Sequence, residues 1–371
     1  MNRLIMLGFI FAATVLLILG HLGLYGTLVN FFHIPANDAR RSLLIILLIL
    51  GISFPITSVL VFWKEAFFTN LLYSISSVWL GFVWYAVLAA VLIWLISFAG
   101  QLLKMNLPLA HILTSLLLIA AAITFYGTWN ALHPVVRQYT ITMKDLPTAW
   151  QNQKVVQLSD IHLGPVHRQT FLKKVVEMTN QENPAAVFIT GDLFDGGGRD
   201  LAALADPLEN LKSTFGNFYI IGNHETYIGV DRSIAALDGL QINILRDQVV
   251  EVSGIQILGI DYPTSSTKKD LTPDLSKLDQ SKPSIVLWHE PKYVEQIKNA
   301  KVNLLLSGHT HDGQVWPFGE ITKWVYKGFN NGLKTDGDFN IYTSPGIGTW
   351  GPPLRTGNRP TIAVFTLQNK L

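Results

Sequence analysis

The stretch LLLSGHTHDG, from Leu304 to Gly313, begins as an apolar run typical of a buried strand and ends with two histidines separated by one threonine. Such histidines can be surface residues of a turn, or they can be ligands of a metal ion. Side chains two positions apart in an extended chain point to the same side, so His309 and His311 can face one centre or two neighbouring ones. The rest of the sequence decides between these interpretations.

Five apolar runs of the second half of the chain end in residues that can bind metals. The residues that follow these runs are, in chain order, Asp160 and His162, Asp192 and Asp195, Asn223 and His224, His289, and finally His309 and His311. Helical patterns such as RQTFLKKVVEMTNQEN alternate with the runs and predict a layered α/β fold, a β-sandwich flanked by helices. In α/β sheets, ligands bind at the carboxyl ends of strands, which is where these side chains stand. Gly191, Gly222 and Gly308 precede them and allow a tight backbone.

The side chains in question are carboxylates, imidazoles and one amide, and the chain of 371 residues contains no cysteine. Oxygen and imidazole ligands without thiolate favour Mn²⁺, Fe or Zn²⁺. The set is too large for one ion and has the right size for two. Two such cations, about 3.5–4 Å apart, act on phosphate esters because they activate a shared water and clamp the attacking and leaving oxygens. The sequence therefore predicts two divalent cations, with Mn²⁺ as the first choice and Fe or Zn²⁺ as alternatives.

The first third of the chain has a different composition. Charged residues make up 15% of the whole chain, against about 25% in an ordinary soluble protein, and few of them lie in roughly the first 130 residues. Four apolar runs, near residues 4–28, 43–63, 71–98 and 107–129, have the roughly 20 residues that a membrane-spanning helix needs. The first run can also be a cleaved signal peptide, but three more runs follow it closely.

These patterns predict a four-helix transmembrane domain over residues 1–132, a linker over 133–152 and a second domain over 153–371. Arg40, Arg41 and Lys104 in the connecting loops favour a cytoplasmic position for those loops, while three other basic residues oppose it. We therefore expect a multi-pass protein of the cell membrane with its second domain outside the cytoplasm. Only His21 and His111 are ionisable within the runs, which favours an anchor in the lipid bilayer over a transporter.

Five motifs, SDIHLG, GDLFD, GNHE, LWHEP and GHTHDGQ, resemble those of the calcineurin-like metallophosphoesterases over residues 155–367, and the tail SPGIGTWGPPLRTGNRP is similar to that of the bacterial membrane-anchored branch. The resemblance implies a metallophosphoesterase domain whose first metal is held by Asp160, His162, Asp192 and His311. It implies a second metal held by the bridging Asp192 with Asn223, His289 and His309. It makes His224 the acid near the leaving group and Asp195 the carboxylate that orients it. Asp312 departs from the glycine common in this branch.

The leading hypothesis is a membrane-bound phosphohydrolase that cleaves a phosphodiester or pyrophosphate bond by metal-activated hydroxide, on a lipid-linked substrate. Arg355 and Arg359 are candidates to bind a second phosphate, or they are solvated loop charges. The aromatic residues of the segment 316–329 contact lipid, line an acyl pocket or belong to the core. A nucleotide phosphodiesterase or nuclease is an alternative, but the net charge of +2 gives no reason to expect nucleic acid. A non-catalytic sensor of a phosphorylated ligand is another, although every expected ligand is present.

Overall fold

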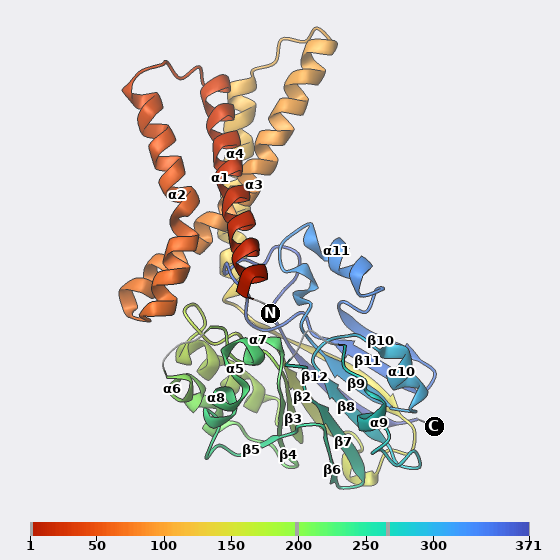
Figure 1. The fold of residues 1–371 in the computed structure, drawn as a ribbon. Helices are drawn as coiled ribbons and strands as arrows, with labels where there is room; N and C mark the ends of the chain where they lie inside the picture. Colours follow the sequence, from red (N-terminus) through yellow and green to blue (C-terminus); the bar gives the residue numbers. More distant parts are fainter. Residues whose placement is uncertain (1–2, 197–199, 265–267, 371) are drawn as a thin grey trace. The chain divides into compact units, whose positions relative to one another are not determined.

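The computed structural model describes residues 3–196, 200–264 and 268–370 of the chain. The chain forms two compact units, one made of residues 1–129 with 351–354 and the other of residues 130–350 with 355–371. Figure 1 draws both units, and each is described by itself below.

The first unit is a set of long apolar helices. They are α1 (Arg3–Phe31), α2 (Asp38–Trp63), α3 (Phe67–Leu102) and α4 (Leu109–Ala131). All four are long and apolar enough to cross a membrane, and they coincide with the four predicted runs. His21 of α1 is buried within this unit, where its Nε2 accepts a hydrogen bond of 3.0 Å from the Trp79 indole. This contact gives His21 a structural role, whereas His111 is exposed.

The second unit contains two six-stranded sheets. In spatial order, the first sheet consists of β1 (Val135–Met143), β12 (Thr361–Asn369), β2 (Lys154–Leu158), β3 (Ala186–Thr190), β4 (Gly216–Ile220) and β5 (Ile242–Ile244). The second consists of β10 (Gly332–Asp336), β11 (Phe339–Thr343), β9 (Leu304–Ser307), β8 (Ser284–Trp288), β7 (Ile255–Ile260) and β6 (Gln248–Val252). Strands β2, β3 and β4 are parallel, and so are β8 and β9.

Short helices flank the two sheets. Along the first half of this unit lie α5 (Gln169–Gln181), α6 (Leu201–Ala205), α7 (Asn223–Ile228) and α8 (Val230–Ala235). Along the second half lie α9 (Thr272–Leu275), α10 (Val294–Asn299) and α11 (Phe318–Val325), and 3₁₀ turns occupy Thr148–Trp150, Asp206–Asn210 and His311–Gly313. Figure 1 shows α5, α6 and α8 beside the first sheet and α9 and α10 beside the second.

Alternating side chains hold these layers together. In β3, Phe188 belongs to the core between the two sheets, while its neighbours Val187 and Ile189 belong to the outer core that includes Leu172 of α5. This two-residue period is expected of a strand buried on both faces, since successive side chains point to opposite sides. The predicted fold class, a helical transmembrane bundle followed by a helix-flanked α/β sandwich, is confirmed.

One strand lies where the sequence suggests a linker. Within the segment 133–152, β1 pairs in parallel with β12 over nine residues, from Val135 opposite Thr361 to Met143 opposite Asn369. Because β1 is at the edge of its sheet, it keeps exposed polar residues such as Arg137 and buries only alternate residues such as Ile141. Because of these polar residues, the sequence has no apolar run that would predict a strand here.

Candidate metal centre

The predicted metal ligands follow β2, β3, β4, β8 and β9 and meet at the carboxyl ends of these strands. Three overlapping groups of side chains have their ligand atoms within 4.8 Å of one another. The groups are Asp160, His162 and His311, then His162, Asp192 and His224, and finally Asp192, His289 and His309. Parallel strands end at the same edge of their sheet, and the corresponding edges of the two sheets meet here. Residues up to about 150 positions apart therefore converge.

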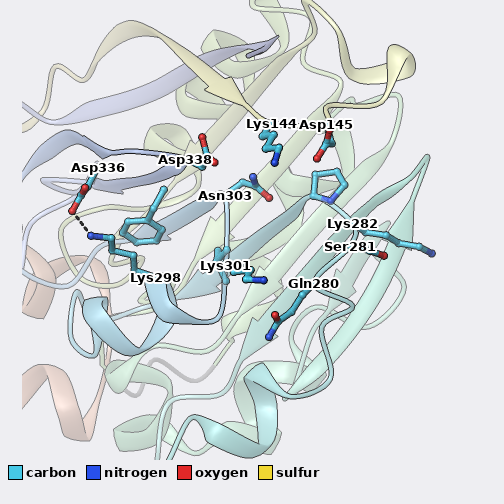
Figure 2. Close-up of a pocket in the computed structure, with 13 residues that line it drawn as sticks. Lys144, Asp145, Gln280, Ser281, Lys282, Lys298, Lys301, Asn303, Asp336 and Asp338 are labelled. Carbon is cyan, nitrogen blue, oxygen red and sulfur yellow. Dashed lines mark hydrogen bonds and ion pairs between the residues drawn. The ribbon is translucent and has the colours of Figure 1, made fainter. Parts of the chain in front are cut away.

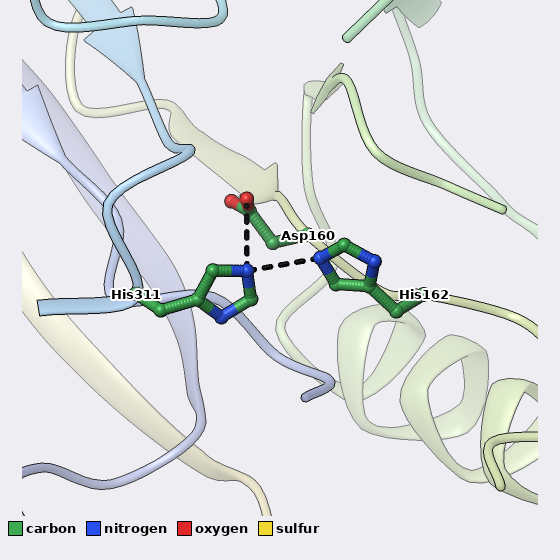
Figure 3. Close-up of side chains that lie close together, drawn as sticks. All are labelled: Asp160, His162 and His311. Atoms are coloured by element: carbon green, nitrogen blue, oxygen red, sulfur yellow. Dashed lines mark hydrogen bonds and ion pairs between the residues drawn. The ribbon is translucent and has the colours of Figure 1, made fainter. Parts of the chain in front are cut away.

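The first group is buried and compact (Figure 3). The Nε2 atoms of His162 and His311 lie 2.9 Å apart, and His311 Nε2 lies 3.5 Å from an oxygen of Asp160. Burial, together with the positive charge of His224, lowers the pKa of His162 to about 4. Burial also raises the pKa of Asp160 to about 6, although His289 opposes it. At neutral pH the group therefore offers a neutral imidazole and a carboxylate, which are ligands for a divalent cation.

The third group has one of its histidines, His289, already oriented. His289 Nδ1 donates to the carbonyl of Thr190 at 2.7 Å, so its Nε2 faces Asp192 at 3.1 Å and the Asn223 oxygen at 3.1 Å. The same Asn223 oxygen lies 2.7 Å from His309 Nδ1. A backbone acceptor on the far nitrogen is the usual support of a metal-bound histidine. Burial opposes charge at His289, but Asp192 and Asp160 outweigh it and raise the pKa of His289 to about 10.

His224 and Asp195 form a pair beside these groups. His224 Nδ1 lies 3.1 Å from an oxygen of Asp195, and the backbone N–H of His224 donates to Asp192 at 2.9 Å. Burial lowers the pKa of His224, but the hydrogen bond to Asp195 and the charge of Asp192 outweigh it and raise the pKa to about 9. His224 is therefore protonated at neutral pH and can donate a proton into the site.

The backbone of the site is strained. Five of the predicted ligands have positive φ values between 48° and 71°, namely Asp160, His162, Asp192, His309 and His311. Non-glycine residues rarely adopt this conformation, and where they do it is commonly at functional sites. The glycines between strand and ligand leave no room for a side chain. A Cβ on Gly222 would lie 2.2 Å from the Asp192 carboxylate, and one on Gly308 would lie 2.0 Å from Ser159 Oγ.

Glu225, in the motif GNHE, is a supporting residue of the site to which no role was assigned from the sequence. Its buried carboxylate accepts backbone hydrogen bonds from Gly222 at 2.7 Å, Asp192 at 3.0 Å and Phe194 at 3.1 Å. It thereby fixes the loop after β3 to the loop after β4. Its position three residues after the helix N-cap Gly222 is the sequence signal, because glutamate there commonly reaches back to the cap.

The two arginines of the tail have different surroundings. Arg359 is exposed, whereas Arg355 is fully buried, and its guanidinium donates to the Gly348 carbonyl and lies 3.0 Å from His311 Nδ1. An arginine only donates, so His311 Nδ1 is an acceptor and the proton of the neutral ring sits on Nε2. A cation that binds His311 through Nε2 must therefore displace this proton, which moves to Nδ1 if the ring stays neutral, so that the contact with Arg355 rearranges. With that proviso, the donor set fits divalent cations.

A pocket of about 260 Å³ lies elsewhere in the second unit, at the amino ends of β8 and β9 (Figure 2). Two of the lysines that line it already pair with carboxylates, since Lys298 contacts Asp336 and Lys282 contacts Glu251. Its lining residues are all different from the predicted ligands. The pocket is therefore separate from the predicted ligands, which follow the opposite ends of these strands.

Comparison with known proteins agrees with the geometry. The family model of the calcineurin-like phosphoesterases matches residues 153–313. An uncharacterized metallophosphoesterase of Campylobacter jejuni is 34% identical over 276 residues, which cover 72% of this chain and 71% of that protein. The chain belongs to the calcineurin-like phosphoesterase family. The matched range contains all seven predicted ligands, and the resemblance that predicted them is confirmed as a family relationship.

Two further relatives bear on the length and on the membrane. The uncharacterized metallophosphoesterase of Helicobacter pylori strain J99 is 38% identical over 222 residues, which are 58% of this chain and 60% of that protein. The chain thus spans about 60% of the length of this relative. A Bos taurus protein named transmembrane protein with metallophosphoesterase domain is 30% identical over 272 residues, 68% of this chain and 61% of that protein. Together with the four apolar helices, this relative indicates a membrane protein.

Proposed function

We propose that the protein is a membrane-bound, two-metal phosphohydrolase that cleaves a phosphodiester or pyrophosphate bond in a lipid-linked substrate. The observation that supports this most is the position of Asp192. Its carboxylate belongs to two of the three ligand groups, with His162 on one side and with His289 and His309 on the other. A carboxylate placed in this way can bridge two cations, and a bridged pair is suited to phosphoryl transfer.

The proposed ligands divide into two sets that share this carboxylate. The first cation is assigned to Asp160, His162, Asp192 and His311, and the second to Asp192, Asn223, His289 and His309. Divalent cations, with Mn²⁺ as the first choice, neutralise phosphoryl oxygens and make water acidic enough to attack phosphorus near neutral pH. The buried side chains keep bulk water out, and this strengthens every electrostatic interaction inside the site.

His224 is proposed as the general acid. In the metal-free protein its pKa is raised to about 9, which favours the protonated ring, and Asp195 holds the ring by a contact of 3.1 Å at Nδ1. The other ring nitrogen, Nε2, is then the atom that donates a proton to the departing oxygen. Arg355 is proposed to hold His311, because its guanidinium is buried against that ring, whereas the exposed Arg359 is the candidate to contact a second phosphate.

The membrane supports the lipid-linked part of the proposal. Four helices suited to a bilayer precede the phosphoesterase domain, so the site acts close to lipids. Arg40 and Arg41 lie in the first turn of α2 and Lys104 lies between α3 and α4. These basic residues favour a cytoplasmic position for the ends of the helices that carry them. With an even number of crossings, we infer that the phosphoesterase domain lies outside the cytoplasm.

The test is a substrate panel for the purified full chain with Mn²⁺. The panel contains a water-soluble phosphodiester, a nucleotide pyrophosphate and detergent-solubilised lipid phosphodiesters and pyrophosphates. We expect hydrolysis that a chelator abolishes, that Asp192→Asn loses, and that is fastest with the lipids. A preference for the nucleotide would favour the nucleotide phosphodiesterase instead. Cation binding without hydrolysis of any member would favour the sensor and overturn the proposal.

A further inference from the structure

Helix α11 carries an apolar side that the rest of its domain leaves exposed. None of its eight residues, all within the described part of the chain, is buried. Its large apolar side chains Phe318, Ile321, Trp324 and Val325 are all exposed, with Trp324 reaching 82%. At 3.6 residues per turn these four positions occupy about one third of the helix circumference, which makes them a continuous stripe. Trp316, just before the helix, is exposed as well.

The polar residues of α11 lie on a different side. Glu320 and Lys323 are exposed and pair with each other at 4.0 Å, outside the stripe. Gly319 and Thr322 are half-buried and lie on the side that faces the domain. A Cβ on Gly319 would lie 3.2 Å from the Asp312 carbonyl oxygen. A short helix with one apolar side that includes tryptophan, next to lysine, is typical of helices that lie in the membrane interface.

We propose that α11 docks on the lipid bilayer and inserts its stripe into the boundary between headgroups and acyl chains. The bilayer is chosen as the partner of the stripe because the chain carries four helices that are suited to cross a membrane. Only residues 132–134 separate the last of these helices from β1. A membrane surface is thus permanently within reach of the domain, so that weak insertion by one helix suffices. Tryptophan prefers this boundary, and Lys323 has the long stem that keeps a charge in the headgroup layer.

The helix is joined to the metal centre at both ends. Before α11, the Asp312 carboxylate accepts hydrogen bonds from Asn330 at 2.6 Å and Asn331 at 2.9 Å, closing the segment on itself. After α11, the Tyr326 hydroxyl donates to Glu290 at 3.3 Å, and the Tyr326 ring lies 6.2 Å from that of the predicted ligand His309. Docking of α11 therefore brings the headgroup layer beside the site. Only one further step, the entry of headgroup phosphoesters into the site, rests on the proposed function.

The chain contains no cysteine, so single cysteines can be labelled without other changes. We suggest Ile321→Cys and Trp324→Cys, each labelled with an environment-sensitive fluorophore in the full chain. The protein is reconstituted in vesicles of phosphatidylethanolamine and phosphatidylglycerol. Lys323→Cys is the matched control, because position 323 is on the same exposed helix but lies about 100° round from Trp324. Quenching is measured with a nitroxide-bearing lipid and with aqueous iodide.

We expect the lipid nitroxide to quench the labels at 321 and 324. Iodide should quench these two labels at most about half as much as the label at 323, because side chains of an interfacial helix are buried roughly 5–10 Å deep in the membrane. Equal iodide quenching at all three positions, without lipid quenching, would overturn the proposal. Protection from iodide without lipid quenching would also overturn it, because protein, such as a second copy, would then cover the stripe. Neither readout requires hydrolysis, so a failure here is distinct from a failure of the proposed function.

Discussion

Replacement of Asp195 by asparagine tests the proposed general acid. The pKa of His224 rises from 6.5 to about 9, which at about 1.4 kcal/mol per pKa unit is roughly 3.4 kcal/mol in favour of the protonated ring. Asp195 contributes through a hydrogen bond of 3.1 Å and through its charge. A charged hydrogen bond is worth about 1.5–3 kcal/mol and a neutral one about 0.5–1.5. Asparagine keeps the acceptor and loses the charge, so we expect a loss of about 1.4 kcal/mol and a decrease of the pKa by about one unit.

The assay is the pH dependence of kcat for two phosphodiesters. An alkyl leaving group needs the proton of His224, so its hydrolysis falls as pH rises through the pKa of His224, and in Asp195→Asn this fall should begin about one pH unit lower. A nitrophenyl leaving group departs without a proton, so its profile should shift much less. Bound cations lower the pKa of His224 in both proteins, which makes the difference between them the quantity to compare.

The control for this prediction is Asp200→Asn, since Asp200 caps α6 through a hydrogen bond to Ala203 that asparagine retains. We expect its two profiles to match those of the wild type. Identical alkyl profiles for the wild type and Asp195→Asn would refute the assignment of His224 as the acid. Equal slowing of both esters at every pH would refute it as well, because the effect would then be on the metals or on folding.

Three other predictions concern cation binding, measured by titration calorimetry. Asp192→Asn should weaken Mn²⁺ binding by more than the roughly 10–100-fold typical of supporting residues, and unchanged affinity at both sites would contradict the bridge. Glu225→Gln should weaken Mn²⁺ binding by about 10–100-fold without removing a ligand, because the amide N–H₂ cannot accept from the loop backbone; a variant with wild-type affinity would show that Glu225 does not position Asp192. In the metal-free protein His289, with a pKa of about 10, is protonated at neutral pH and must lose its proton to bind a cation. Affinity should therefore rise with pH up to about 10 and protons should be released on binding; an affinity independent of pH between 6 and 9 would contradict this.

The convergence of the predicted ligands followed from the sequence because two local rules suffice. Each ligand follows an apolar run, and such runs in an α/β sequence form parallel strands whose ends meet at one edge. Spacing by two then puts Asp160 with His162, and His309 with His311, on one side of the chain. The structure differs in detail, since His162 and His311 sit in left-handed turns after the strands and not in extended chain. Convergence of the loops, more than the pleat of a strand, brings these rings together.

The supporting residues were not predictable in the same way. Arg355 and His311 are 44 positions apart, and their contact depends on the path of an irregular loop that no periodic pattern describes. The motif GNHE contains Glu225, but its three backbone donors belong to two different loops and appear only when β3 and β4 are side by side. The same holds for α11, whose eight residues are too few for a clear helical period next to Pro317.

The strained ligands explain why these supports matter. A left-handed non-glycine residue costs on the order of 1–3 kcal/mol, and five ligands adopt that conformation. Three of these ligands are held by a residue from another loop. Glu225 accepts from the backbone of Asp192, Asp160 accepts from the backbone N–H of His309 at 2.9 Å, and Arg355 holds the ring of His311. The loops therefore hold one another in place. The loss of one supporting residue should then also loosen ligands that this residue does not contact.

Mutual support of this kind has a measurable consequence. Substitutions in two independent sites add in free energy, whereas substitutions in one connected network do not. Glu225 and Arg355 support opposite ends of the centre, through Asp192 and His311, and both ends meet at His162, which lies 3.9 Å from Asp192 and 2.9 Å from His311. The double variant Glu225→Gln with Arg355→Lys should thus weaken Mn²⁺ binding by less than the product of the single effects, because either change alone already loosens the shared ring. Strict additivity would mean that the two ends are held independently.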